Sequence, residues 1–141
     1  MIYSRDHEDT LLIAPVAMTN SATQTANFDT AGAGYATIRV CLASAINTNA
    51  VGPTLSLKQS DDTVVTNFAT VVADLSAVSI VNKREVVYGV DLRGKKRYLR
   101  ISCTTATATN DNVTVAIIGT LSKNEDGPNG TTGVADQVVF V

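Results

Sequence analysis

A chain of 141 residues with 45% hydrophobic and 17% charged residues has enough apolar side chains for one folded domain and lacks a disordered composition. Its net charge of -2 argues against a dedicated nucleic-acid binder, which would carry a basic excess to neutralise phosphates. The longest apolar runs, such as residues 113–118, are too short to span a bilayer, so no membrane partner is expected.

The first segment of the single domain predicted over residues 1–141 is an extended N-terminal arm, residues 1–20. Its start is polar and acidic without the features of a secretion signal, so synthesis without secretion is expected. An apolar run follows at residues 11–18, in which Pro15 cannot donate a hydrogen bond to a sheet. Pro15 therefore indicates an edge strand or an arm, and we favour the arm. The candidate partner-binding residues here are Leu11, Leu12 and Ile13.

Residues 21–123 are predicted to form an all-β core, an antiparallel β-sandwich or a jelly-roll-like barrel. Apolar and polar residues alternate between Tyr35 and Ala45, which predicts a strand with one buried face. The alternation returns at residues 55–58, 85–92, 98–104 and 113–121. Turn-forming residues separate these segments about every ten residues, as is typical of a sandwich or barrel. The predicted core residues are Ile38, Val40, Leu42, Leu55, Leu57, Leu99, Ile101, Val115 and Ile117.

A hairpin is predicted around the polar stretch Ser60 to Asp62, which ends the alternation that begins at Leu55. Residues 63–68 read as the returning strand. Residues 69–81 are ambiguous between a short helical turn and another strand.

The one dense charge cluster, here named the basic corner, consists of Arg93, Lys95, Lys96 and Arg97. Gly94 inside it suits the left-handed conformation of a tight hairpin. The cluster is either a solvated corner or a docking site for an acidic patch of a partner protein, because arginine pairs carboxylates in bidentate fashion. Nucleic acid is a poorer partner, since no exposed aromatic residues interleave with these charges.

The C-terminal segment, residues 124–141, reads as a flexible linker followed by a short apolar strand. Four apolar residues in water need a partner, so they either add a strand to the parent sheet or reach a neighbouring subunit. We expect that the edge they meet belongs at least partly to a neighbour. The candidate partner-binding residues are Val138, Val139, Phe140 and Val141.

Residues suited to catalysis or metal binding are sparse. The single histidine, His7, precedes the predicted core and has no rigid neighbours to make it an acid, a base or a ligand. Cys41 and Cys103 lie far apart without metal-ligand spacing, so we expect two free thiols, buried or half-buried. We therefore predict no enzyme activity, no cofactor, no metal and no small-molecule substrate.

A resemblance to a known family rests on three runs, LSLKQSDDTVVTNF, RGKKRYLRIS and the alternating VTVAIIGTL. Their spacing and composition, across roughly Tyr35 to Leu121, resemble the capsid decoration or cement proteins of tailed bacteriophages. The resemblance implies a homo-oligomer, trimer or dimer, made in the host cytoplasm and bound to the outside of the virion. There it would bind the major capsid protein and stabilise contacts between capsid subunits, without a catalytic residue.

Two alternatives remain beside this interpretation. A phage tail or head-completion protein could have similar β architecture and would differ in its number of copies per virion. A carbohydrate-binding sandwich would normally expose a row of aromatic residues, whereas Tyr35, Tyr88 and Tyr98 are scattered and tryptophan is absent.

Overall fold

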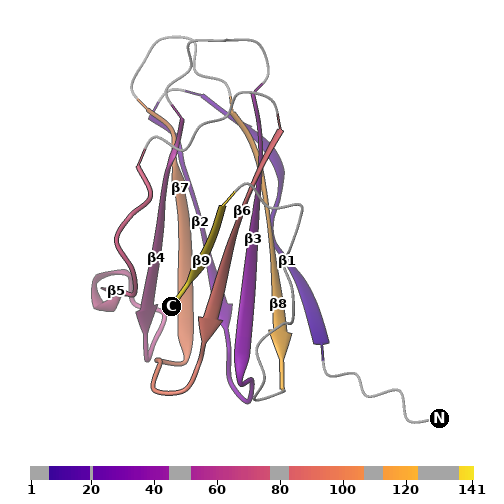
Figure 1. The fold of residues 1–141 in the computed structure, drawn as a ribbon. Helices are drawn as coiled ribbons and strands as arrows, with labels where there is room; N and C mark the ends of the chain where they lie inside the picture. Colours follow the sequence, from indigo (N-terminus) through magenta and orange to yellow (C-terminus); the bar gives the residue numbers. More distant parts are fainter. Residues whose placement is uncertain (1–6, 20, 45–51, 77–82, 107–112, 124–136) are drawn as a thin grey trace, which may run out of the picture.

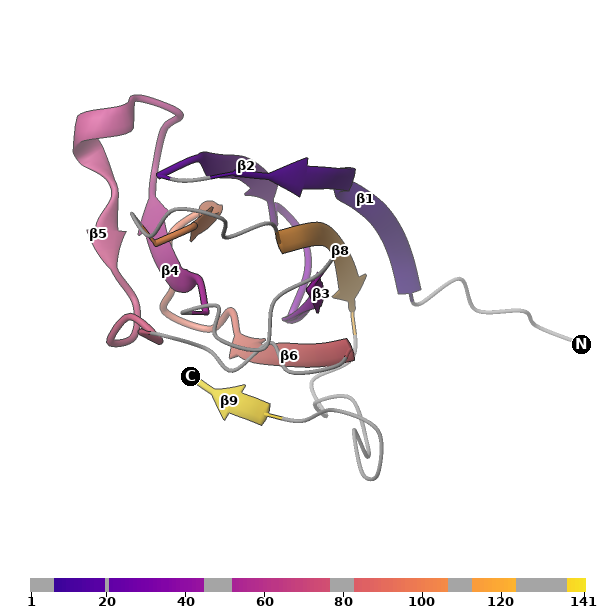
Figure 2. The same ribbon diagram turned by 90° about the horizontal axis from the view of Figure 1, so that it is seen from above.

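Two β-sheets packed against each other form the fold, which is seen along two directions in Figures 1 and 2. The computed structural model describes residues 7–19, 21–44, 52–76, 83–106, 113–123 and 137–141. The larger sheet contains, in spatial order, β1 (His7–Met18), β8 (Val113–Ser122), β3 (Tyr35–Ser44), β6 (Lys83–Asp91) and β9 (Gln137–Phe140). The smaller sheet contains β2 (Thr23–Asp29), β7 (Tyr98–Thr104), β4 (Thr54–Ser60) and β5 (Ala69–Thr70).

The predicted all-β sandwich is confirmed, and its strands pair antiparallel except for β6 with β9, which are parallel. Alternate residues of β7 and β8 are buried, as the two-residue period of their sequences requires. Every predicted core residue is buried, from Ile38 in β3 to Ile117 in β8. The core also takes in side chains that are not among the predicted core residues, including Met18, Phe28 and Tyr88.

The two sheets interdigitate where Phe28 of β2 packs over Gly119 of β8. A Cβ atom at position 119 would lie 2.7 Å from Cε1 and 2.8 Å from Cζ of Phe28, and 3.0 Å from Cδ1 of Leu12. Phe28 is only 4% exposed, so its ring has little room to move away. Glycine is therefore required here by close packing, because any side chain would displace the aromatic ring.

The segment predicted as an N-terminal arm is, from His7 to Met18, the edge strand β1 of the larger sheet. It pairs antiparallel with β8 along its length, with register shifts between Leu11 and Ile13 and between Ile13 and Val16. Pro15 lies within the second irregularity, where a missing backbone donor does no harm. The preferred arm reading is thus wrong for these residues, and the edge strand, the alternative that Pro15 left open, is correct.

The returning strand predicted at residues 63–68 is also wrong. These residues form a bend and a short 3-10 turn, η1 (Val65–Asn67), and the strand that pairs with β4 is the two-residue β5. Two register pairs, Lys58 with Thr70 and Gln59 with Ala69, make up this ladder. The chain returns later than expected because side-chain hydrogen bonds at the corner hold the loop in another shape, as described below.

The C-terminal residues add a strand to the sheet of their own chain. β9 runs parallel to β6, with Val86 to Gly89 opposite Gln137 to Phe140. The backbone of Val141 continues the pairing, donating to the Gly89 carbonyl and accepting from the Asp91 amide, each at 2.9 Å. Of the two options open from the sequence, the structure shows pairing with the parent sheet. The additional contact with a neighbour, expected in an oligomer, stays a prediction. The predicted linker up to residue 136 lies outside the described residues.

Replacing Ile101 by alanine tests the core. Ile101 is fully buried in the middle of β7, so truncation should lower the free energy of unfolding by about 2–5 kcal/mol. Urea denaturation measures the change. The matched control is Val65→Ala, a truncation of a side chain that is 71% exposed, which should change stability by less than about 0.5 kcal/mol. Equal effects of the two variants would contradict the assignment of Ile101 to the core.

Replacing Gly119 by alanine tests the contact between the sheets. The added methyl group collides with the Phe28 ring, so we expect a loss of about 1–3 kcal/mol in the free energy of unfolding. In the double variant Gly119→Ala with Phe28→Leu the colliding ring is gone. Its loss should be smaller than the sum of the two single losses. Additive losses would show that the two residues do not touch.

Candidate partner-binding site

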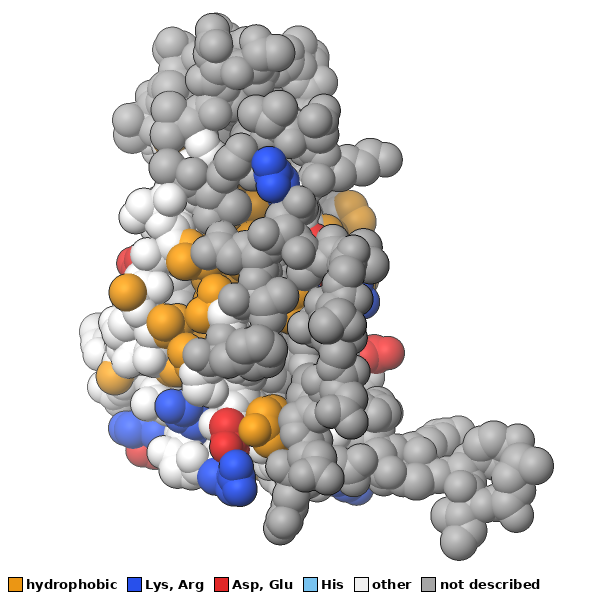
Figure 3. Space-filling view, viewed as in Figure 1, with side chains coloured by type: hydrophobic (Ala, Val, Ile, Leu, Met, Phe, Trp, Pro, Cys, Tyr) orange, Lys and Arg blue, Asp and Glu red, His pale blue; other side chains and the backbone are white. Residues whose placement is uncertain are grey.

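The basic corner connects β6 of the larger sheet to β7 of the smaller sheet. The two strands do not pair with each other, so the hairpin expected around Gly94 is wrong and the corner is a turn between the sheets. Gly94 has φ 76°, in the left-handed region that glycine adopts readily, and the Lys95 amide donates to the Leu92 carbonyl at 3.0 Å. The four basic side chains of this corner are therefore displayed at one end of the sandwich. Figure 3 shows basic and acidic side chains side by side at this end.

Two arginines of the corner are paired with acids of the same chain. Arg93 holds Asp91 with both Nε and Nη2, the latter 2.6 Å from Oδ2. Arg97 reaches across to the end of β2, where its Nε and Nη2 lie 3.0 and 2.7 Å from the two carboxylate oxygens of Asp29. These bidentate contacts have the geometry that the sequence analysis expected toward a partner, but the carboxylates belong to this chain.

The ion pairs change the acidity of the two carboxyl groups. Hydrogen bonds from the side chain and backbone of Arg93 lower the pKa of Asp91 to about 2. The Arg97 guanidinium lowers the pKa of Asp29. Both carboxylates thus remain charged at neutral pH, and each neutralises its arginine. This internal pairing favours the solvated-corner interpretation for Arg93 and Arg97.

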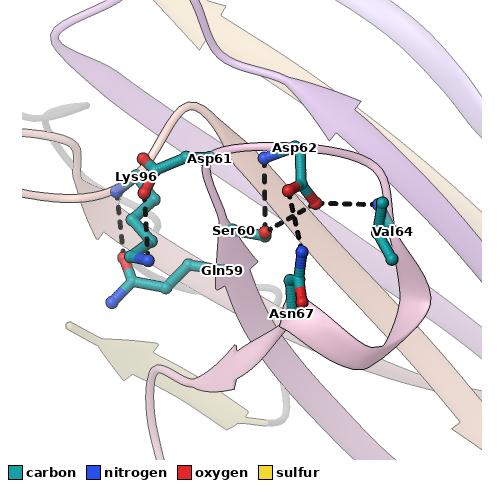
Figure 4. A network of polar contacts seen from close by, with 7 residues as sticks. All are labelled: Gln59, Ser60, Asp61, Asp62, Val64, Asn67 and Lys96. Carbon is teal, nitrogen blue, oxygen red and sulfur yellow. Dashed lines mark hydrogen bonds and ion pairs between the residues drawn. The ribbon is translucent and has the colours of Figure 1, made fainter.

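Lys96 links the basic corner to the end of β4 (Figure 4). Its Nζ lies 3.0 Å from Oδ2 of Asp61, and its backbone amide donates to Oε1 of Gln59 at 3.1 Å. Among the residues that the structure describes, Lys95 is the member of the corner without an acidic partner within ion-pair distance. A partner protein could therefore pair with Lys95 without breaking an existing contact.

The carboxylate of Asp62 organises the loop that follows β4, as Figure 4 shows. It accepts hydrogen bonds from the Val64 amide at 2.9 Å and from Nδ2 of Asn67 at 2.8 Å. Ser60 adds a third contact at 3.3 Å, and these bonds lower the pKa of Asp62. The hydrogen bonds to this carboxylate hold the backbone in a bend, where it would otherwise continue as a strand.

This loop displays apolar side chains to solvent. Val64 is 53% and Val65 71% exposed, and together with Leu11 they are the large hydrophobic residues exposed in the described part of the chain. Hydrogen bonds to the Asp62 carboxylate order the backbone of this loop, so Val64 and Val65 project from a structured turn. Preorganised apolar groups bind at a lower entropic cost than mobile ones. Both valines lie in residues 63–68, which the sequence predicted as a strand, so their exposure on a loop was not expected.

The apolar residues predicted to bind a partner at the two ends of the chain are mostly not exposed where the structure describes them. Leu11 is 59% exposed, whereas Leu12 is half-buried and Ile13 is part of the core. Val139 and Val141 pack partly against the core, near the segment that follows β5, and Figure 3 shows hydrophobic side chains gathered between that segment and β9. The side chains of Val138 and Phe140 lie outside the described residues.

The two thiols differ in their surroundings. Cys103 is fully buried, and burial raises its pKa to about 12, whereas Cys41 is exposed on the outer face of β3. Both are free, but the expectation that both are at least half-buried is wrong for Cys41. The described residues contain no cluster of His, Cys, Asp and Glu that could hold a metal ion. The side chain of His7 is outside them.

Comparison with known proteins gives no family: no protein-family model matches the chain, and no curated protein matches it significantly. In the described part of the chain, none of the helical segments has the length and apolar character needed to cross a bilayer.

Acid titration should test the Asp62 loop. Because the pKa of Asp62 is lowered in the folded protein, its hydrogen bonds stabilise the loop fully above the ordinary value of 3.8 and are lost as the pH falls through the lower folded value. The NMR signals of the Val64 amide and the Asn67 side-chain amide should therefore titrate together, with a midpoint below pH 3.8. A midpoint at or above 3.8 would contradict the network.

The control for this titration is Asp62→Ala, which removes the carboxylate. The common transition of the two signals should then disappear, and amide exchange in residues 63–68 should become faster at neutral pH. The core should remain folded, because Asp62 is exposed and its side-chain hydrogen bonds within the described residues go to Ser60, Val64 and Asn67.

Proposed function

We propose that this chain is a non-enzymatic structural protein of a tailed-bacteriophage virion, a decoration protein that binds the outer surface of the capsid. Its partner would be the major capsid protein, and its effect would be to stabilise contacts between capsid subunits. Synthesis in the host cytoplasm and action on the virion exterior belong to the same proposal. The resemblance in residues 35–121 suggests this function.

The structural observation that supports the proposal most is the position of β1 and β9 at the two edges of one sheet. An edge strand offers backbone donors and acceptors to an extended segment of another protein. A sandwich with two such edges can contact two neighbours at once, and many weak contacts of this kind reinforce one another on a repetitive shell. This geometry suits a protein that connects neighbouring subunits.

The charges at the basic corner would contribute only modestly to the binding of the capsid. Three of its four cations are already neutralised by acids of the same chain, which leaves Lys95 for an acidic group on the shell. Binding should then rest mainly on backbone and apolar contacts. Salt should weaken it only moderately, since one exposed ion pair contributes little.

Co-sedimentation with isolated shells tests the proposal. Purified protein should bind shells of the phage that encodes it until saturation, at a fixed ratio to the major capsid protein, and should add density at symmetry axes in reconstructed images. The variant Lys95→Glu should weaken binding, whereas Lys123→Glu, an exposed charge reversal at the end of β8, serves as the matched control.

The copy number distinguishes the proposal from its nearest alternative. A few copies confined to one vertex would indicate a tail or head-completion protein and would contradict decoration. Absence of binding to shells would reject both. Retention on a polysaccharide column without binding to shells would favour a carbohydrate-binding module, although Tyr88 is fully buried and Tyr35 and Tyr98 are half-buried.

A further inference from the structure

Two cations that face each other across β4 and β7 lack acidic partners. Lys58 pairs in register with Arg100, so their side chains lie on the same outer face of the smaller sheet. Within the described residues neither has a carboxylate at ion-pair distance, in contrast to Arg93, Lys96 and Arg97. Like charges directly opposite each other destabilise a sheet. A role of Lys58 and Arg100 in binding another molecule would explain why two like charges stand opposite each other.

The guanidinium of Arg100 is held in place by neutral groups. Its Nε donates to Oδ1 of Asn27 at 2.8 Å, and its Cζ lies 3.9 Å from the centre of the Phe68 ring. Phe68 closely follows the exposed Val64 and Val65, so the ordered loop lies beside the two cations. We name Lys58, Arg100, Val64 and Val65 the basic face. It combines positive charge that lacks acidic partners among the described residues with exposed apolar side chains.

A second surface has the opposite charge and also carries an exposed apolar residue. Glu8 and Asp9 are exposed near the start of β1, and the structure describes no basic side chain within ion-pair distance of either. Asp9 and Leu11 lie opposite Thr120 and Ile118, so both are on the outer face of the larger sheet. Glu8 lies opposite Leu121 and projects from the other face of the same edge strand, where it is also exposed. We name Glu8, Asp9 and Leu11 the acidic edge.

The carboxylates of the acidic edge remain available to a partner. Oδ1 of Asp9 accepts a hydrogen bond from the Thr120 hydroxyl at 2.6 Å, which leaves its other oxygen unused by any contact described here. The nearby cation Arg39 is engaged by Glu85, and Glu85 is also the main cause of its raised pKa, to which Asp9 adds a minor part.

We propose that the basic face of one copy of this chain docks on the acidic edge of a second copy. The two surfaces complement each other in charge, and together they contain all the large hydrophobic residues that are exposed in the described chain, Leu11, Val64 and Val65. Figure 2 shows η1 and β1 on opposite sides of the molecule, so the contact is head-to-tail. Such a contact closes a ring if the rotation allows it and otherwise forms a filament.

A homo-oligomer is already implied by the resemblance to decoration proteins. This inference goes beyond it by assigning the two surfaces that meet, and it does not depend on a capsid. A nucleic acid would also be attracted by Lys58 and Arg100, but it would have no use for exposed valines beside them. An acidic segment of an unrelated protein fits the basic face but leaves the acidic edge unexplained. A second copy uses both surfaces, which is why we favour it.

Analytical ultracentrifugation of charge-swapped variants tests the proposal. The face variant is Lys58→Glu with Arg100→Glu, and the edge variant is Glu8→Lys with Asp9→Lys. Wild-type protein should self-associate, more weakly as salt rises, and each variant alone should associate at least about tenfold more weakly because its two surfaces now repel. An equimolar mixture of the two variants should associate again, since each altered surface then meets its complement.

Two further variants separate a loss of self-association from a loss of folding. Lys58→Glu alone places an acid opposite Arg100, so the fold should be kept while self-association weakens, even if the double face variant fails to fold. Lys95→Glu is the matched control and should leave self-association unchanged, although it should weaken binding to shells. A wild-type protein that stays monomeric up to about 1 mM, or variants that fail to restore association when mixed, would overturn the proposal. Wild-type protein that binds DNA fragments but not itself would also overturn it.

Discussion

The burial of alternate side chains between two facing sheets is the constraint on which the rest of the structure depends. The inner faces are apolar, and one polar atom among them, the hydroxyl of Tyr88, has no hydrogen-bond partner among the described groups. Burial raises the pKa of that phenol. Such a core fixes which face of each strand is inside, because a one-residue slip would bring every polar neighbour into it.

Because the core uses one face of each strand, the specific polar contacts lie on the outer faces and at the corners. On the smaller sheet the hydroxyls of Thr23 and Thr104 lie 3.0 Å apart. At the corners the acids Asp29, Asp61 and Asp91 each take up one basic side chain. The surface is therefore largely neutralised by its own chain, and the few charges left without partners stand out as candidates for contacts with other molecules.

Much of the fold was predictable from the sequence, since alternation along a strand such as β3 is a local signal. The corner after β4 was not predictable in this way. There the Asp62 carboxylate accepts hydrogen bonds from backbone and side-chain donors, and these bonds compete with the pairing of a return strand. Pro15 indicated an edge, but only the pairing with β8 shows that the edge belongs to the sheet. The opposition of Lys58 and Arg100 depends on pairing between distant segments, so no local pattern reveals it.

The pairing of β1 with β8 also has a consequence for how the chain folds. His7 to Met18 find their partner only in Val113 to Ser122, so the first described strand has no neighbour in its sheet until almost the whole chain has been synthesised. Sheets built from such distant pairings close slowly, because the loop entropy is lost before the contacts form. During that interval Ile13 and Met18, which are buried in the finished protein, are exposed to other chains. Rapid synthesis at high concentration would therefore favour exchange of β1 between molecules, and slower synthesis at lower temperature should give more correctly folded protein.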